Sequence, residues 1–599
     1  MIYHCEDHTC NYWDEGEKLP ERCPQCGRKL LRANEADMTG DDWTALGNTL
    51  WDAEASDKKR MVDCFRKAAY LGSAWGVCNL GICMEQGNGV EADPVQAFWL
   101  YQQAVEMGSL NAVCCLGVCY QYGIGTAPDA EKAAELYCKA AEYGSPRGQM
   151  LLARAFHDGI GVEADAAEAV HWVRAAAYQR YGEGMYRLGV CYEYGDGVEQ
   201  NWEHAVHWFR EAAESGVSVA MTDLGYCYEK GCGVEQSWEQ AFSWYRRGAE
   251  CGDLRSMHNL GYCYEKGRGV EQSWEQAFSW YRRGAECGYP VSMSNLGLCY
   301  KRGYGVEQNW QEAIKWYEQG AQCGDLQCMH NLACCYERGE GVEQNEDRAL
   351  YWYRRGAEAG SDYCMYCLGW NYSNGEGVEQ NMTEAIRWYT AAAEGGNADA
   401  MHNLGWLYDH GEGVEQDMKK AICWYERAAE QNHPAAMNSL GECYAMGRGV
   451  PRDLETAMEW YRRAAELGEA MADYNMGWHL EQAGKLSEAY AHYRKAADGN
   501  DDSAWWALGR FYENGVVVAQ DGKEARRCYE TGEKLGSVKC KMRLARCKLL
   551  GIGGRREKKA GLDLCRQALE LAKESSEKED YGYEAEMNLL RRTIAENES

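Results

Sequence analysis

Proline is scarce in this sequence, with 8 residues in a chain of 599. Because proline lacks a backbone N–H and interrupts helices, its scarcity leaves long stretches free to be helical. The apolar fraction is 46%, and 23 Trp and 41 Tyr add large surfaces that can be buried. This composition excludes disorder of the whole chain.

Positive charge is also in short supply. The chain has 63 Lys and Arg against 93 Asp and Glu, which gives a formal net charge of −30. Such a chain repels the phosphates on which nucleic-acid affinity depends, and it repels anionic membranes in the same way. We therefore expect a protein or peptide partner, and the charge favours a basic one.

The sequence shows no export signal and no long apolar run. Its start, MIYHCEDHTC, has neither a basic nor an apolar segment, and no run of about eighteen apolar residues follows. We expect a cytoplasmic protein without membrane contact. In that setting most of the 30 cysteines are expected to be reduced and buried as small hydrophobic side chains.

A repeat of 36 residues runs through most of the chain. Leucines recur at this spacing at 80, 116, 152, 188, 224, 260, 296, 332, 368, 404 and 440. With Leu46, Met476, Leu508 and Leu544 the series makes fifteen units. Residues 224–259 and 260–295 differ at five of 36 positions, so these two units are near-copies. Such regularity is typical of a stacked array.

One unit shows the structure that each repeat is expected to form. Met257, Leu260 and Gly261 lie on one face of a predicted helix, roughly 254–266, in which Gly261 leaves room for a neighbouring helix. A Gly-x-Gly-Val turn follows.

A second helix is predicted over roughly 274–287. Ser273 and Gln276 form a capping-box pattern at its start, and Gly288 is suited to end it in the left-handed conformation.

Such a helical hairpin cannot bury both of its faces alone, so neighbouring repeats must stack. The sequence therefore predicts an all-α fold, a right-handed α-solenoid of about 15 helix–turn–helix repeats over 33–553. A charged helical cap is expected over 554–599, after a small module at 1–32. We expect a monomer.

The pattern of residues 398–432 resembles the Sel1-like repeat, a relative of the tetratricopeptide repeat. It combines small-x-x-x-Leu-Gly-x-x-Tyr, a Gly-x-Gly-Val loop and Lys/Glu-Ala-x-x-Trp-Tyr-x-x-Ala-Ala. The resemblance implies a bacterial-type scaffold that binds a protein or peptide in a concave groove lined by the first helices. Cysteine-rich relatives are associated with β-lactamase activity, so a hydrolase is the alternative.

Most of the catalytic motifs that the hydrolase alternative would need are missing from the sequence. The Ser-x-x-Lys spacing occurs at Ser56 and at Ser575, but Ser-Asp-Asn and Lys-Thr-Gly do not occur. Gly-x-Ser-x-Gly, His-Glu-x-x-His and a Walker motif are missing as well. We therefore expect no enzyme.

Four cysteines near the N-terminus, Cys5, Cys10, Cys23 and Cys26, predict a structural metal site. They lie in two turns, and Cys23-Pro-Gln-Cys26-Gly resembles the knuckle of zinc ribbons and rubredoxin-like modules. Four thiolates suit tetrahedral Zn²⁺, although a sulfur-only site also fits iron. His4 or His8 could replace one thiol, and four unrelated cysteines are the alternative.

Two sets of side chains are candidates for contact with a partner. By analogy with tetratricopeptide grooves, the first helices expose them on the concave side. The polar set is His258, Asn259, His330, Asn331, His402 and Asn403, and the aromatic set is Tyr226, Tyr262, Trp370 and Trp406. The alternatives are ordinary polar helix positions for the first set and core packing for the second.

Nine further cysteines recur three residues after the key leucine. They are Cys83, Cys119, Cys191, Cys227, Cys263, Cys299, Cys335, Cys443 and Cys547. Equivalent helices lie too far apart for disulfides between them, so these thiols are predicted to fill the core. Metal storage would instead require exposed and clustered thiols.

Overall fold

The computed structural model describes residues 2–5, 13–15, 30–32, 35–51, 55–578 and 584–598. Near the N-terminus, β1 (Ile2–Cys5), β2 (Trp13–Glu15) and β3 (Leu30–Arg32) form an antiparallel sheet in the order β2-β1-β3. A short 3₁₀ helix, η1 (Glu35–Asp37), leads into the helical array.

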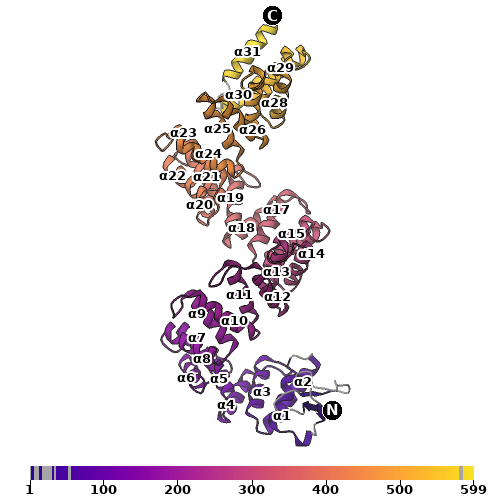
Figure 1. Cartoon of the computed structure of the whole chain (residues 1–599). Helices are drawn as coiled ribbons and strands as arrows, with labels where there is room; N and C mark the ends of the chain where they lie inside the picture. Colours follow the sequence, from indigo (N-terminus) through magenta and orange to yellow (C-terminus); the bar gives the residue numbers. More distant parts are fainter. Residues whose placement is uncertain are drawn as a thin grey trace. The chain divides into compact units, whose positions relative to one another are not determined.

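The array alternates two kinds of helix, named here helix A and helix B (Figure 1). The A helices are α1 (Gly40–Thr49), α3 (Ala74–Gln86), α5 (Leu110–Tyr122), α7 (Pro146–Asp158), α9 (Gly182–Tyr194), α11 (Ser218–Lys230), α13 (Leu254–Lys266), α15 (Pro290–Arg302), α17 (Leu326–Arg338), α19 (Asp362–Asn374), α21 (Ala398–His410), α23 (Pro434–Met446), α25 (Ala470–Gln482), α27 (Asp502–Asn514) and α29 (Val538–Leu550).

The B helices are α2 (Ala55–Tyr70), α4 (Pro94–Glu106), α6 (Ala130–Glu142), α8 (Ala166–Tyr178), α10 (Trp202–Glu214), α12 (Trp238–Glu250), α14 (Trp274–Glu286), α16 (Trp310–Gln322), α18 (Glu346–Glu358), α20 (Met382–Glu394), α22 (Met418–Glu430), α24 (Leu454–Glu466), α26 (Leu486–Asp498), α28 (Gly522–Lys534) and α30 (Lys558–Lys578). One more helix, α31 (Glu584–Glu598), packs on α29 and α30. The predicted solenoid of about fifteen helix pairs is confirmed.

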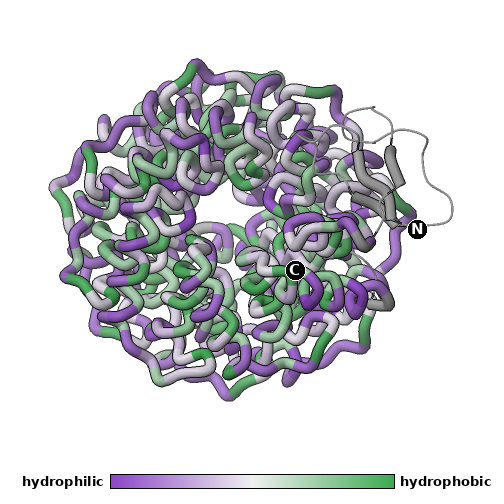
Figure 2. The backbone as a smooth tube through the Cα atoms, turned by 90° about the horizontal axis from the view of Figure 1, so that it is seen from below, coloured by the Kyte–Doolittle hydropathy of each residue, from purple (hydrophilic) through white to green (hydrophobic). Residues whose placement is uncertain are grey.

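The chain divides into two compact units, 1–309 and 310–599. Within each unit a helix A packs against the helix B that follows it, and that helix B packs against the next helix A. Hydrophobic and hydrophilic stretches alternate along the helices of both units, as Figure 2 shows. Each unit is thus a stack of hairpins that bury their apolar faces against one another.

The unit around α13 and α14 shows why these residues form a hairpin. Gly267 has a left-handed φ of 66° and ends α13, which only a residue without Cβ adopts easily. The Ser273 hydroxyl accepts from the Gln276 backbone N–H at 3.3 Å and so starts α14. The predicted cap is therefore present, and Ser273 also donates to Glu275.

The glutamine of the repeated Gly-Val-Glu-Gln loop has a structural role. The Gln272 Nε2 donates to the Glu265 carbonyl at 2.8 Å, and Gln236 and Gln308 make the same contact one repeat away. This contact satisfies a carbonyl in the last turn of helix A that has no partner within the helix. The Gly-x-Gly-Val-Glu-Gln segment is therefore a structural turn that follows helix A, as the sequence predicted.

A tyrosine of helix B fills the core of most repeats. Tyr281 is fully buried and its hydroxyl donates to Glu265 at 2.8 Å. A Cβ on Gly261 would lie 2.6 Å from the Tyr281 ring. Gly261 therefore makes room for the Tyr281 ring of the neighbouring helix α14, as the sequence predicted.

The A helices lie on the inner side of the stack in each unit. Consecutive A helices contact each other directly, as in α1 with α3, α3 with α5 and α5 with α7, and in the second unit α27 with α29. Among the described residues, consecutive B helices do not come as close. This closer packing is what an inner surface formed by the A helices requires. That the A helices line a binding groove stays a prediction.

Candidate partner-binding surface

The sequence-predicted contact residues all lie on A helices, but in two groups. Tyr226 on α11 and His258, Asn259 and Tyr262 on α13 belong to the first unit. The other six belong to the second unit: His330 and Asn331 on α17, Trp370 on α19, and His402, Asn403 and Trp406 on α21. Within each unit these residues lie on the A helices of neighbouring repeats.

The aromatic set is accessible to a partner. Tyr226 and Trp370 are each 44% exposed and Trp406 is 36% exposed. Tyr262 is half-buried. Trp406 stacks on His410 with ring centroids 4.3 Å apart, so its orientation is held before any partner arrives. Core packing does not explain these exposed rings, because large apolar side chains gain free energy by leaving water.

The histidines are wedged between aromatic rings. The His258 ring lies 5.6 Å from the Tyr281 ring and 5.9 Å from the Tyr289 ring. His330 has the same arrangement with Tyr353 and Tyr363. Among the described atoms, the Nδ1 atoms of His258 and His330 are buried and have no hydrogen-bond partner.

Burial sets the charge of two of these histidines. It lowers the pKa of His258 to about 4, and it lowers the pKa of His402 to about 4 with a further contribution from the charge of His433. The neutral imidazoles can accept or donate one hydrogen bond at neutral pH.

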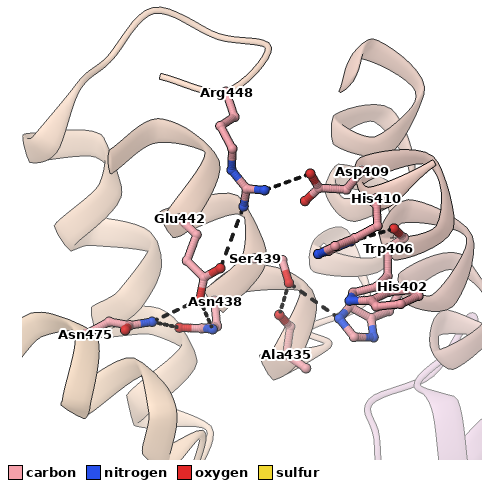
Figure 3. A network of polar contacts seen from close by, with 10 residues as sticks. All are labelled: His402, Trp406, Asp409, His410, Ala435, Asn438, Ser439, Glu442, Arg448 and Asn475. Atoms are coloured by element: carbon pink, nitrogen blue, oxygen red, sulfur yellow. Dashed lines mark hydrogen bonds and ion pairs between the residues drawn. The ribbon is translucent and has the colours of Figure 1, made fainter. Parts of the chain in front are cut away.

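A polar network lies on the A helices α21, α23 and α25 of the second unit (Figure 3). Arg448, in the loop after α23, reaches Asp409 at 2.8 Å and Glu442 at 3.8 Å. Glu442 also accepts from Asn438 and Asn475, each at 3.2 Å.

The two carboxylates of this network have different surroundings. Asp409 is 3% exposed and occupies the repeat position at which Glu265 binds the core tyrosine. Burial raises the pKa of Glu442, which occupies the position of the exposed Trp406. The network is partly buried, with Asp409 and Asn438 in the interior and Arg448 and Glu442 partly exposed, and it links three adjacent A helices.

Sequence reasoning missed this network. The repeat alignment carried a signal, because Glu442 stands where other repeats have Tyr226, Tyr262 or Trp406. An acidic residue at an aromatic position needs a charged or polar partner when it is buried. Arg448 could have been suggested by this rule, but its loop position gave no indication of its direction.

The nine repeated cysteines lie in the core, as predicted. Eight of them are buried, and Cys191 is partly buried. Burial raises the pKa of Cys263 to about 12 and that of Cys83 to about 11, which makes these thiols poor nucleophiles and poor metal ligands. Metal storage would need thiols that are exposed and clustered. Among the described cysteines of this set, we find no such cluster.

The predicted metal ligands fall largely outside the described residues. Cys10, Cys23 and Cys26 lie there, and Cys5 is described only as the last residue of β1. In the part of the chain that the structure describes, no group of three or more His, Cys, Asp or Glu side chains is arranged to hold a metal ion. The four-cysteine site stays a prediction.

A family model for the Sel1 repeat matches fourteen segments between residues 76 and 573, one after another. The chain belongs to the Sel1 repeat family. The matched segments extend the array seen in the sequence into α30, which packs as the helix B of α29.

Two solved structures of Sel1 repeat proteins are similar to this chain. A protective antigen present in uropathogenic Escherichia coli strains is 32% identical, with a TM-score of 0.52, over 75% of this chain and 97% of the antigen. A Sel1 repeat protein from Oxalobacter formigenes is 31% identical, with a TM-score of 0.38, over 41% of this chain and 96% of its own. No curated protein matches the chain.

These matches give the hydrolase alternative no support.

Among the described helices, none has both the length and the apolarity needed to cross a membrane.

Proposed function

We propose that this Sel1 repeat protein is a scaffold or adaptor that binds a protein or peptide along the surface of its A helices. The observation that carries the proposal is that aromatic rings are left exposed there, among them Tyr226, Trp370 and Trp406. Exposed, oriented aromatic side chains are the commonest energetic anchors of protein interfaces. The net charge of −30 favours a partner with basic residues.

The test is affinity capture from a lysate of the source organism with the full chain. The variant Trp370→Ala/Trp406→Ala is compared with Tyr351→Ala, which removes an exposed ring (52% exposed) from the helix B α18. We expect specific proteins to be retained by the parent and by Tyr351→Ala, and reduced about tenfold or more in the double variant. Equal retention by all three chains contradicts the proposed surface.

We further propose that Cys5, Cys10, Cys23 and Cys26 hold one structural Zn²⁺. Four thiolates suit tetrahedral zinc, and a segment this short has little core of its own. The antiparallel pairing of β1 with β2 and β3 supports a small ribbon in this part of the chain.

Metal analysis of the full chain tests the zinc proposal. The parent is expected to carry about one zinc per chain, which is lost when all four cysteines become Ser. Cys251→Ser is the control, because Cys251 is an exposed thiol of the array. Metal that survives the fourfold substitution contradicts the site, and iron in place of zinc corrects its identity.

A further inference from the structure

One repeat of the first unit contains a cavity beside a core position that an aromatic ring fills in the neighbouring repeats. It has a volume of about 560 Å³ and lies between α7, α8 and α9. Pockets that accept small ligands or large side chains have volumes of this size. Ala153, Val170 and Val173 form part of its wall. The polar part of the lining carries both charges: it includes Arg147, Arg154, His157 and Arg187 together with Asp158, Glu183 and Asp196.

The cavity arises where the repeated core ring is missing. Val173 stands at the position of Tyr137, Phe209 and Tyr245, which are buried in the neighbouring repeats. Ala153 stands where those repeats have glycine under the ring. Ala333 has the same methyl group and yet Tyr353 is present and buried, so the cavity follows from Val173.

A third position changes together with these two. His157 replaces the glutamate that accepts the tyrosine hydroxyl in other repeats, as Glu229 does from Tyr245 at 2.8 Å. The His157 ring instead contacts Asp158 at 2.7 Å and Asp196 at 3.2 Å. This repeat therefore lacks both the ring and its hydrogen-bond acceptor.

Two arginines beside the cavity lack a carboxylate partner. Arg147 donates to the Asn111 side chain at 2.6 Å and to the Cys115 sulfur at 3.6 Å. Within the described residues, neither Arg147 nor Arg187 forms an ion pair, whereas Arg154 pairs with Asp158 at 3.3 Å. Arg187 takes the position of Asp223 and Asn259, so a positive charge has replaced acidic and neutral side chains on α9.

We propose that this cavity, the vacant-tyrosine pocket, takes an aromatic side chain of the protein partner, with a carboxylate of the same partner beside it. The ring would occupy the place that Tyr137 and Tyr245 fill in their own repeats, against Val170 and Val173. The carboxylate would pair with Arg147 and Arg187, because guanidinium groups bind carboxylates with directed hydrogen bonds. This inference rests on the proposed scaffold function, to which it adds one specific anchor.

The test uses N-acetyl-L-tyrosine as a probe, because it carries both the ring and a carboxylate. N-acetyl-L-tyrosine amide lacks the charge, and N-acetyl-L-alanine lacks the ring. Saturation-transfer NMR with the full chain is expected to show saturable binding of N-acetyl-L-tyrosine. The amide is expected to bind about tenfold more weakly, and N-acetyl-L-alanine is expected to give no signal.

Two variants locate the binding. Ala153→Gly/Val173→Tyr restores the residues of the other repeats and is expected to abolish binding of N-acetyl-L-tyrosine. Phe209→Tyr is the matched control, because it changes the same position in the next repeat, where a ring is already present. Arg187→Gln alters an exposed side chain and is expected to reduce the difference between acid and amide, because Arg147 remains. The Arg187→Gln variant tests the carboxylate contact even if Ala153→Gly/Val173→Tyr folds poorly.

Three results would overturn the proposal. They are no binding of N-acetyl-L-tyrosine to the parent, undiminished binding to a folded Ala153→Gly/Val173→Tyr variant, and an acid-to-amide difference that is unchanged in Arg187→Gln. Capture of a protein partner is measured separately. A parent that captures a partner but does not bind N-acetyl-L-tyrosine retains the scaffold function and loses only the pocket.

Discussion

At the residue scale, one tyrosine of helix B fills the core of most repeats. The Tyr281 ring fills the space left by Gly261, and its hydroxyl donates a hydrogen bond to Glu265. The neighbouring residues therefore match the size, shape and polarity of this side chain. The natural chain already contains the comparison, because Val173 at the same position leaves a cavity.

Tyr281→Val is therefore expected to destabilise the first unit. Loss of a fully buried ring with incomplete collapse lowers the free energy of unfolding by about 3 kcal/mol. Urea unfolding followed by circular dichroism measures the effect as a lower midpoint. Tyr351→Val, at a site that is 52% exposed, should leave the midpoint nearly unchanged. Similar midpoints for both variants would mean that the ring is not a main source of stability.

Buried neutral histidines make stability depend on pH. His258 and His402 have pKa values of about 4 in the fold, against 6.5 for the free side chain, since burial disfavours their charge. The unfolded chain then binds more protons between pH 6.5 and 4, so stability falls as the pH falls through this range.

The variant His258→Asn/His402→Asn should lose less stability than the parent between pH 7 and pH 5. Urea midpoints at the two pH values measure the difference. His171→Asn, at an exposed position on α8, should keep the parent's pH dependence. An unchanged slope in the double variant would show that the two histidines are not the groups that titrate.

At the scale of the element, the C-terminal turn of helix A is capped by a side chain of the loop that follows it. Gln272 binds the Glu265 carbonyl, and the same contact is made by Gln200, Gln236, Gln308, Gln380, Gln416 and Gln520. Arg452 and Arg556 take over this contact in later repeats. The loop therefore holds its own hairpin without help from the next repeat.

Gln272→Ala is expected to lower the stability of the first unit by about 1 kcal/mol, the usual net contribution of a hydrogen bond. The urea midpoint measures it. Glu271→Ala removes the exposed neighbour and should have a smaller effect. Equal effects would indicate that loop charge, rather than the carbonyl contact, is the source.

The helices and their limits could be predicted because they follow from local rules. Leu260, Gly261 and Ser273 predicted α13 and α14 to within a residue or so, since periodicity and capping act over one or two turns. The exposed aromatic positions could be identified by repeat register.

The remaining features depend on side chains that meet only in space. The ion pair of Asp409 with Arg448 joins residues 39 apart, and the role of Gln272 requires the path of the loop. The vacant-tyrosine pocket was visible in the alignment as Val173, but its volume depends on how far α7 and α9 close around it.

At the scale of the whole molecule, each unit is held together by contacts between neighbours. Helices A and B contact their own partner and the adjacent hairpin, so stability is a sum of local terms. A whole repeat should then be removable if the register is kept.

Deletion of residues 260–295 joins Asn259 to Leu296, which preserves the Asn-Leu-Gly sequence of the repeat. We expect a folded chain with unchanged helicity per residue in circular dichroism and one repeat fewer in its small-angle scattering profile. Deletion of residues 260–277 removes half of a repeat and is the control, which should unfold part of the first unit. Unfolding by the full-repeat deletion would show long-range dependence between repeats.

The near-identity of residues 224–259 and 260–295 bears on how the length of the array can vary. The two repeats differ at five of 36 positions, so a junction between them has nearly the same sequence at any point within the repeat. Gain or loss of one copy would therefore change the length of the protein by 36 residues and leave the neighbouring junctions nearly unchanged.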